Sequence, residues 1–215
     1  MYLQSTFFRF ALPGEIKLRT LTAPLLVLIT GAPCTGKTTI AQHLANEFHL
    51  PFIHKDGIKE RLFDRLGWKD DRQWSKLLSL ASYDLLYYFI DAQLKAGRSL
   101  IAEANFKADI DTQQILDLHA RYTFTPFQIF CYADPQILIQ RFVERGNSAA
   151  RHQGHIDQIM VADIRTSLLM NEYRPLEVGG QLLEIDTTEL FSLDYTPVTT
   201  ALAQAMGQSP SEVAS

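Results

Sequence analysis

Eight residues near the beginning of the chain have the types and the spacing of a phosphate-binding loop. Residues 31–38 read GAPCTGKT and match the pattern G-x-x-x-x-G-K-[ST] at every fixed position. In such a loop the glycines allow successive backbone N–H groups to face a phosphate, and the lysine, here Lys37, contacts the β- and γ-phosphates. The hydroxyl that follows, Thr38, is of the type that ligates Mg²⁺. We therefore predict a triphosphate site formed by Gly31, Ala32, Pro33, Cys34, Thr35, Gly36, Lys37, Thr38 and Thr39.

The sequence on both sides of this phosphate loop agrees with that prediction. Residues 25–29 (LLVLI) are a continuous apolar run, which is typical of a strand buried on both faces of a parallel sheet. A helix is predicted to start near Lys37, and its N-terminal dipole would face the same phosphate. The alternative is a glycine-rich turn that binds nothing. The helix is indicated by apolar residues three and four apart: Ile40, Ala41, Leu44, Ala45 and Phe48.

Asp56 lies two residues after a second predicted strand, residues 50–54, so we expect it at the same edge of the sheet as the phosphate loop. A carboxylate there can orient a hydroxyl that attacks the γ-phosphate, or accept its proton. Aspartate is also a favoured N-cap, so Asp56 could begin the next helix, and the two roles are compatible. Arg61, five residues further on, is a candidate contact for an anionic or polar acceptor.

Glu103 is the only acidic residue of a third predicted strand, residues 99–104. Burying a carboxylate without partners is unfavourable or shifts its pKa. At the end of the strand it can avoid that cost by facing a substrate hydroxyl or water bound to Mg²⁺. Pairing with an arginine at the sheet edge is the alternative. Asn105 could contact substrate or cap the following loop.

Three arginines in the second half of the chain suit a lid over the phosphates. Arg141 and Arg145 are four residues apart and share a helix face, and Arg151 follows in a polar segment bounded by glycines. Guanidinium groups stabilise the charge on a transferring phosphoryl group, and a closed lid excludes water. The alternative is a solvated helix face beside Glu144.

The predicted strands alternate with helices, which indicates an α/β fold with a parallel sheet covered on both faces. We expect one domain at residues 24–206, with the lid at about 146–155. An N-terminal extension at 1–23, which could pack as an edge strand or a lid, and a flexible tail at 207–215 would flank it. The strands are expected at residues 25–29, 50–54, 99–104, 127–132 and 182–186.

Composition narrows the class of protein. Of 215 residues 47% are hydrophobic and 20% charged, as in an ordinary globular domain. The net charge of −4 gives no reason to expect nucleic acid or an anionic membrane as a partner. No apolar run is long enough to span a membrane, and the N-terminus lacks a signal-peptide pattern, so we expect a cytoplasmic protein.

The cysteines and histidines do not point to a disulfide or a metal site. The two cysteines, Cys34 and Cys131, fall in the phosphate loop and in a predicted core strand. Cys34 could be a redox-sensitive thiol at a helix N-terminus, but a small residue that fits the loop is favoured. His152 and His155 are three apart, and without further ligands nearby they indicate a polar loop rather than a metal site.

Four segments together resemble the small P-loop kinases of the nucleoside-monophosphate-kinase-like group, which includes shikimate and gluconate kinases, chloramphenicol phosphotransferase and zeta toxins. The segments are GAPCTGKTT, HKDGIKERLF, IAEANF and RFVERGNSAARH. The resemblance covers residues 25 to about 186 and is greatest to ATP-binding kinases of the zeta-toxin and chloramphenicol-phosphotransferase type, including those grouped with AAA proteins. The chain lacks the Asp-Glu pair after an apolar strand that motor-type AAA ATPases carry.

This resemblance implies a strand order of 2-3-1-4-5, a three-layer P-loop fold, and ATP and Mg²⁺ as cofactors. The base of the family would be Asp56, the lid arginines would be Arg141 and Arg145, and Arg151 is placed less securely. Glu103 would be the acidic residue after the third strand. Residues 185–188 would flank adenine.

We therefore expect an ATP-dependent phosphotransferase that moves the γ-phosphate to a hydroxyl of a small molecule. The catalytic residues would be Lys37, Asp56, Arg141 and Arg145, and the acceptor contacts Asp56, Arg61, Glu103 and Asn105. A nucleotide-binding switch and a zeta-toxin-like kinase acting on a sugar-nucleotide are the alternatives. A pure nucleotide binder would need neither Asp56 nor Glu103 at a strand end. Aromatic side chains that could line the acceptor pocket, or belong to the core, are Trp68, Trp74, Tyr83, Tyr87 and Tyr88.

Overall fold

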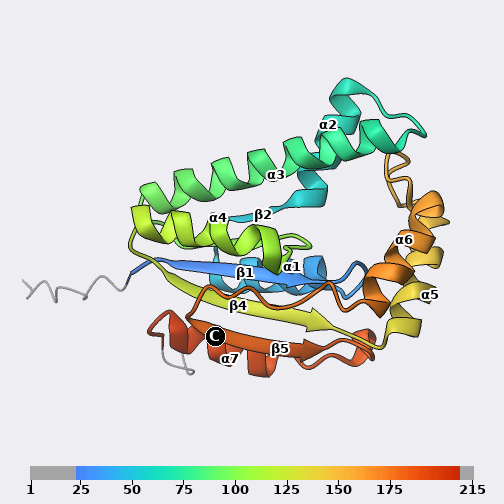
Figure 1. The fold of residues 1–215 in the computed structure, drawn as a ribbon. Helices are drawn as coiled ribbons and strands as arrows, with labels where there is room; N and C mark the ends of the chain where they lie inside the picture. Colours follow the sequence, from blue (N-terminus) through green and yellow to red (C-terminus); the bar gives the residue numbers. More distant parts are fainter. Residues whose placement is uncertain (1–22, 209–215) are drawn as a thin grey trace, which may run out of the picture.

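Five parallel strands form the central sheet, in the order β2-β3-β1-β4-β5 (Figure 1). The computed structural model describes residues 23–208. The α/β class and the strand order expected from the sequence are both confirmed. The strands are β1 (Leu25–Gly31), β2 (Phe52–His54), β3 (Leu100–Glu103), β4 (Thr125–Tyr132) and β5 (Gln181–Asp186).

The strand register brings the functional segments to one edge of the sheet. Ile29 of β1 pairs with Glu103 of β3, and Glu103 pairs in turn with His54 of β2. On the other side of β1, Gly31 pairs with Cys131 of β4. Because all five strands run the same way, the residues after each strand lie together at the carboxyl edge.

Helices cover both faces of the sheet. On one face, α1 (Lys37–Phe48) and α7 (Thr196–Ala205) pack against Val27 and Ile29. On the opposite face, α3 (Arg72–Lys95) and α4 (Ala108–Arg121) pack against Leu26 and Leu28. The alternation along β1, whose residues are all buried, therefore divides the core into two layers.

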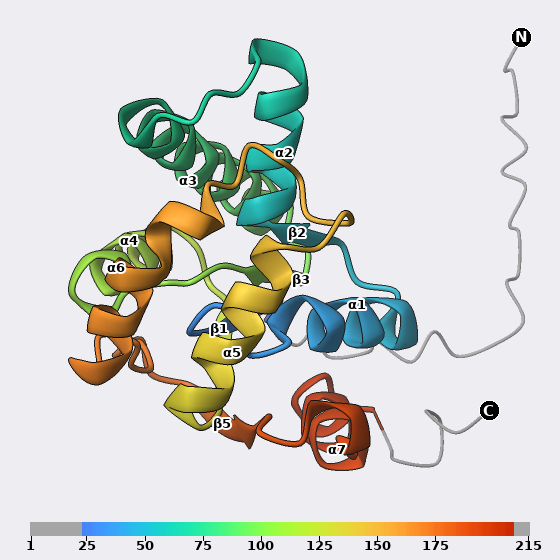
Figure 2. The same cartoon turned by 90° about the vertical axis from the view of Figure 1, so that its right-hand side faces the viewer.

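Three further helices stand at the carboxyl edge of the sheet (Figures 1 and 2). They are α2 (Lys55–Leu66), α5 (Pro135–Gly146) and α6 (Asp157–Leu169). The loop between α5 and α6 reaches toward α2. Helix α3 serves two regions: its C-terminal half, with Leu86, Ile90 and Leu94, lies in the core, and its N-terminal half extends past the sheet beside α2. A short 3₁₀ helix, Leu190–Ser192, follows β5.

The sequence pattern predicts helices at about residues 112–121 and 156–173, and one boundary of each differs in the structure. Helix α4 begins at Ala108 rather than near residue 112, because the Asp111 carboxylate accepts a hydrogen bond from the Lys107 N–H at 2.6 Å and caps the first turn. Helix α6 ends at Leu169 rather than near residue 173, and Asn171 then has a left-handed φ of 51°, which does not continue a helix. The expectations for the N-terminal extension and the tail fall almost wholly outside the described residues.

Within the described range, no helix combines the length and the apolar composition needed to cross a membrane.

Candidate active site

A cavity of about 640 Å³ opens at the carboxyl edge of the sheet. The phosphate loop forms one wall, and α2, α3 and the loop after β3 form a second. The third wall consists of α5, α6 and the predicted lid, residues 146–155. The cavity therefore brings together segments that are more than 100 residues apart in the chain, as predicted for residues that follow parallel strands.

The phosphate loop depends on backbone conformations that favour glycine. Gly31 has a φ of +137°, and a Cβ there would lie 2.0 Å from the carbonyl oxygen of Cys131. Gly36 precedes α1 with a φ of +75°. Cys34 has a φ of 66° although it carries a side chain, so the loop holds one strained residue. Burial raises the pKa of the Cys34 thiol, which disfavours the redox-sensitive thiolate considered above.

The Lys37 ammonium is buried inside the loop. Its Nζ donates to the carbonyl oxygen of Ala32 at 2.7 Å and lies 3.5 Å from the hydroxyl of Thr35. The side chain makes no ion pair within 4.0 Å among residues 23–208. A buried cation held only by neutral oxygens has no counter-charge and is suited to an anionic ligand.

Thr38 and Glu103 form the one side-chain hydrogen bond between α1 and β3 within residues 23–208. The Thr38 hydroxyl donates to Glu103 Oε2 at 2.8 Å. Burial raises the pKa of Glu103, against the opposing effects of the Lys37 charge and the Thr38 hydrogen bond. Glu103 is buried and contacts a hydroxyl, so the alternative of an arginine partner is not what the structure shows.

These two oxygen groups fit Mg²⁺, which prefers hard oxygen ligands and takes few of them from the protein. The described residues contain no cluster of three or more His, Cys, Asp or Glu side chains that would form an all-protein cage. A magnesium ion here would be held by Thr38, by Glu103 directly or through water, and by the phosphates of a nucleotide.

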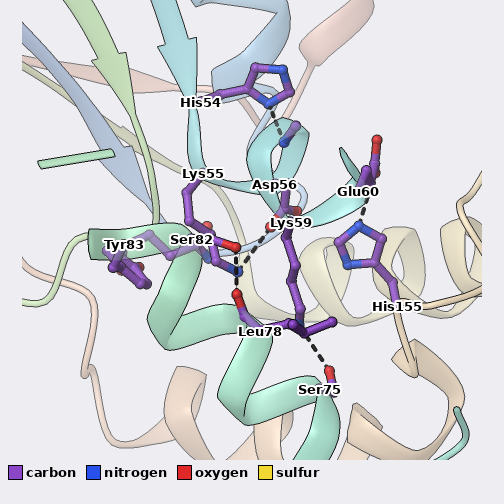
Figure 3. A network of polar contacts seen from close by, with 12 residues as sticks. His54, Lys55, Asp56, Lys59, Glu60, Ser75, Leu78, Ser82, Tyr83 and His155 are labelled. Atoms are coloured by element: carbon purple, nitrogen blue, oxygen red, sulfur yellow. Dashed lines mark hydrogen bonds and ion pairs between the residues drawn. The ribbon is translucent and has the colours of Figure 1, made fainter. Parts of the chain in front are cut away.

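Asp56 projects into the cavity from the first turn of α2 (Figure 3). Its carboxylate pairs with Lys55 Nζ at 3.1 Å and with Arg151 Nη1 at 3.6 Å. Burial alone would raise the pKa of Asp56, but the charges of Lys55 and Arg151 hold that pKa well below its usual range. The N-cap of α2 is His54, whose Nδ1 accepts from the Gly57 N–H at 3.0 Å. Asp56 is therefore free of the capping role that the sequence also allowed.

Two of the three candidate arginines meet on one carboxylate at the lid. Asp157 is buried, and it accepts two hydrogen bonds from Arg151, at 2.8 and 3.2 Å. Arg145 Nη2 lies 3.3 Å from the same carboxylate. The Nε of Arg145 is buried and has no hydrogen-bond partner within the described structure. Both guanidinium groups line the cavity, and sequence analysis missed Asp157, which positions them.

Two predicted site residues lie elsewhere. Arg141 donates to the carbonyl oxygens of Thr187 and Thr188, at 2.9 and 2.6 Å, and does not line the cavity. Arg61 has an 87% exposed side chain on the far side of α2 from the cavity lining. Asn105 does line the cavity. Its backbone carbonyl oxygen accepts a hydrogen bond from the Tyr83 hydroxyl at 3.1 Å.

The acceptor side of the cavity contains residues that sequence analysis did not select. Of the five candidate aromatic residues only Tyr83 lines the cavity. Tyr83 shares one face of α3 with Ser75 and Ser79, each four residues from the next, and Lys55 and Lys59 repeat that spacing on α2. This four-residue spacing of polar side chains is the signal that could have identified both helix faces.

The predicted lid packs on α2 around one aromatic residue. The buried Phe63 ring stacks on His152, with ring centroids 5.2 Å apart, and meets the edge of His155 at 5.5 Å. The two histidines also bond to carboxylates of α2: His152 to Asp64 at 3.1 Å and His155 to Glu60 at 2.9 Å. Burial lowers the pKa of His155 to about 3, so its ring is neutral at neutral pH. Both histidines therefore attach residues 152–155 to α2.

Gly154 of the predicted lid offers a test of this packing. A Cβ at Gly154 would lie 2.5 to 2.8 Å from three atoms of the Phe63 ring. We expect Gly154→Ala to push the lid off α2, because overpacking against a buried ring costs about 1–3 kcal/mol. Trypsin should then cleave within the lid several times faster than in the wild type. Ala149→Ser, at an exposed lid position, is the control, and equal cleavage of the two variants would show that Phe63 does not hold the lid.

Comparisons with known proteins bear on the family and the fold of the chain. Residues 26–166 match the family described as an AAA domain. A solved structure from Chloroflexus aurantiacus J-10-fl, titled a "putative kinase", is 37% identical, with a TM-score of 0.78 over 86% of this chain and 99% of its own. A comparison with curated protein sequences found no match.

More distant solved structures share the fold. A sugar kinase from Janibacter sp. HTCC2649 is 16% identical, with a TM-score of 0.52 over 89% of this chain and 99% of its own. The shikimate kinase of Bacteroides thetaiotaomicron is also 16% identical, with a TM-score of 0.50 over 85% and 98%. The family match covers more than half of the chain, and the three solved structures described above are titled as kinases. The chain therefore belongs to this AAA-domain family and has the fold of the small P-loop kinases of the nucleoside-monophosphate-kinase-like group.

Proposed function

We propose that the protein is an ATP-dependent phosphotransferase that moves the γ-phosphate of ATP to a hydroxyl group of a small molecule. One observation supports this proposal above the others: the Asp56 carboxylate lines the same cavity as the phosphate-loop residues Lys37 and Thr38. A nucleotide site alone does not need a carboxylate beside the γ-phosphate position. A site for transfer to an alcohol does need one.

The phosphate loop and the lid would act on the transferring group from two sides. Lys37 would leave the carbonyl oxygen of Ala32 and contact the β- and γ-phosphates, and backbone N–H groups of the loop would bind the same oxygens. Arg145 and Arg151 would stabilise the charge of the transferring phosphoryl group from the lid. Mg²⁺, held by Thr38 and Glu103, would neutralise part of the phosphate charge.

Asp56 would orient the attacking hydroxyl and receive its proton. Its low pKa makes it a weak base, because Lys55 and Arg151 stabilise the ionised form. Phosphoryl transfer tolerates this, since its transition state is loose and needs little proton transfer before the bond to the leaving oxygen breaks. Orientation is therefore the larger part of the role that we assign to Asp56.

The position of Arg141 suggests a different role from the catalytic one that the sequence indicated. It fixes the backbone of Thr187 and Thr188, in the loop expected to flank adenine. We assign Arg141 to the shape of the nucleotide site and leave the phosphoryl contacts to Arg145 and Arg151.

The proposal is tested by ADP release in the presence of candidate acceptors. With ATP and Mg²⁺ alone we expect slow hydrolysis, because the closed lid excludes water. Hydroxylated metabolites, antibiotics and nucleotides should be added singly, and a true acceptor should raise ADP release by at least about tenfold and give a phosphate ester visible by ³¹P NMR. ATP bound tightly but hydrolysed at one slow rate with every acceptor would instead favour a nucleotide-dependent switch.

A further inference from the structure

The cavity is far more positive than the protein that contains it. Its lining includes eight lysine and arginine residues and only three aspartate and glutamate residues, whereas the whole chain has a net charge of −4. Five of the eight cations have a carboxylate within 4.0 Å. Among residues 23–208, the three that have none are Lys37, Lys59 and Lys76.

Lys37 belongs to the phosphate loop, but Lys59 does not. Lys59 extends from α2 toward α3, where its Nζ donates to the hydroxyl of Ser75 at 2.9 Å (Figure 3). The residue is only 7% exposed, and its Nζ also lies 5.2 Å from the centroid of the Phe63 ring. A buried ammonium with one neutral hydrogen bond and one aromatic face is incompletely compensated.

The direction of the pKa shift of Lys59 agrees with this incomplete compensation of its charge. Burial, together with repulsion from Lys55 and Arg151, lowers that pKa to about 8, and the attraction of Asp56 and Asp157 does not restore it. Lys59 is not needed for the stability of the fold, because an apolar residue of similar size in this buried position should stabilise the fold at least as well. An unsatisfied cation that faces a cavity is instead suited to an anion that enters with a ligand.

The surroundings of Lys59 add further groups of the same kind. Ser75 and Ser79 present hydroxyls from α3, and the exposed Lys76 adds a second unpaired charge between them. Lys59 is three residues from Asp56 on α2, so both side chains emerge on neighbouring sides of one helix. An acceptor with a hydroxyl at Asp56 would therefore place its far end beside Lys59.

We propose that the acceptor carries an anionic group, a carboxylate or a phosphate, and that Lys59, Ser75 and Lys76 bind it while Asp56 faces the acceptor hydroxyl. This inference rests on the proposed function, because it assigns the second substrate of the same cavity. It makes Lys59 a determinant of specificity for acidic, hydroxylated small molecules.

The test measures whether an anion binds when the phosphate loop is already filled. Wild type, Lys59→Met and the control Lys95→Met, at an exposed position on α3 outside the cavity, are saturated with Mg²⁺ and the non-hydrolysable ATP analogue AMP-PNP. Their melting temperatures are then recorded with increasing inorganic phosphate, with sodium acetate, and with potassium chloride at matched ionic strength. The nucleotide analogue itself should raise the melting temperature of all three proteins.

We expect phosphate, acetate or both to stabilise the wild-type and Lys95→Met complexes by about 3–5 °C at ten times the dissociation constant, and not to stabilise Lys59→Met. Stabilisation by acetate alone would indicate that the acceptor carries a carboxylate. Stabilisation by phosphate alone would indicate that the acceptor is phosphorylated. Without added anion, Lys59→Met should melt at or above the wild-type temperature, which would show that it is folded.

Two outcomes would overturn the inference: no anion effect in the wild type, or an equal effect in Lys59→Met. Either result with normal AMP-PNP binding would leave the proposed kinase function standing. Absence of AMP-PNP binding in the wild type would instead count against the kinase function itself.

Discussion

Asp56→Asn is expected to reduce phosphoryl transfer by about 10²–10³-fold while the affinity for ATP stays close to that of the wild type. Asparagine keeps the shape of the side chain but cannot accept a proton from the acceptor hydroxyl. The expected loss lies in the lower part of the range for general bases, because Lys55 and Arg151 already make Asp56 a weak base. Single-turnover kinetics with a saturating acceptor would measure the loss.

Asp84→Asn is the matched control, since Asp84 is exposed on α3 and does not line the cavity. The variant should behave as wild type in transfer and in ATP binding. Asp56→Asn also leaves part of the charge of Lys55 and Arg151 uncompensated, so its melting temperature must be compared with the wild type before rates are interpreted. Full transfer activity in a folded Asp56→Asn protein would remove this residue from the mechanism.

Lys37→Met is expected to have the second large effect, a reduction of kcat/KM for ATP by about 10³-fold, with part of it in ATP affinity. The ammonium is the only lysine charge of the phosphate loop, and methionine has nearly the same length without the charge. Folding should not suffer, because Lys37 has no ion pair in the described structure and contacts only the oxygens of Ala32 and Thr35. Calorimetric titration with MgAMP-PNP separates binding from turnover.

Lys37→Arg serves as the companion variant. It keeps the charge but places a larger, planar group in a buried position, so we expect partial recovery of nucleotide affinity and little recovery of turnover. Unchanged ATP affinity in Lys37→Met would mean that the triphosphate does not lie in this loop.

The part of the site that local sequence patterns determine was predicted from the sequence. The phosphate loop follows from glycines and a lysine at fixed spacing between an apolar run and a helix, all within 24 residues. The positions of Asp56 and Glu103 at one sheet edge follow from the general geometry of parallel strands. These inferences need no knowledge of which helix packs on which.

The remaining residues depend on contacts between distant segments. Asp157 positions Arg145 and Arg151 only because α6 returns beside α5. Lys59 meets Ser75 only because the N-terminal half of α3 extends beside α2. A sequence pattern does not specify either contact, although the four-residue spacing of polar residues marks the faces that make them.

Helix geometry explains why Arg61 and Arg141 do not line the cavity. Five residues turn an α-helix by about 500°, so Arg61 points about 140° away from Asp56, whereas Lys59 points only about 60° away. Arg141 and Arg145 share a face but are separated by about 6 Å along the axis. That rise is enough for Arg145 to reach the Asp157 carboxylate of α6, while Arg141 reaches the loop after β5.

The contacts at the base of α5 determine where the lid can pivot. Thr188 Oγ1 accepts a hydrogen bond from the Asp134 N–H at 3.1 Å, just before the first residue of α5, and Arg141 holds the Thr187 and Thr188 carbonyls two turns later. The first half of α5 is thereby attached to the loop after β5, on the side expected to receive the base of the nucleotide. We therefore expect any swing of the predicted lid to hinge beyond Arg141, within the last turn of α5, and to move only the segment that carries Arg145 and Arg151.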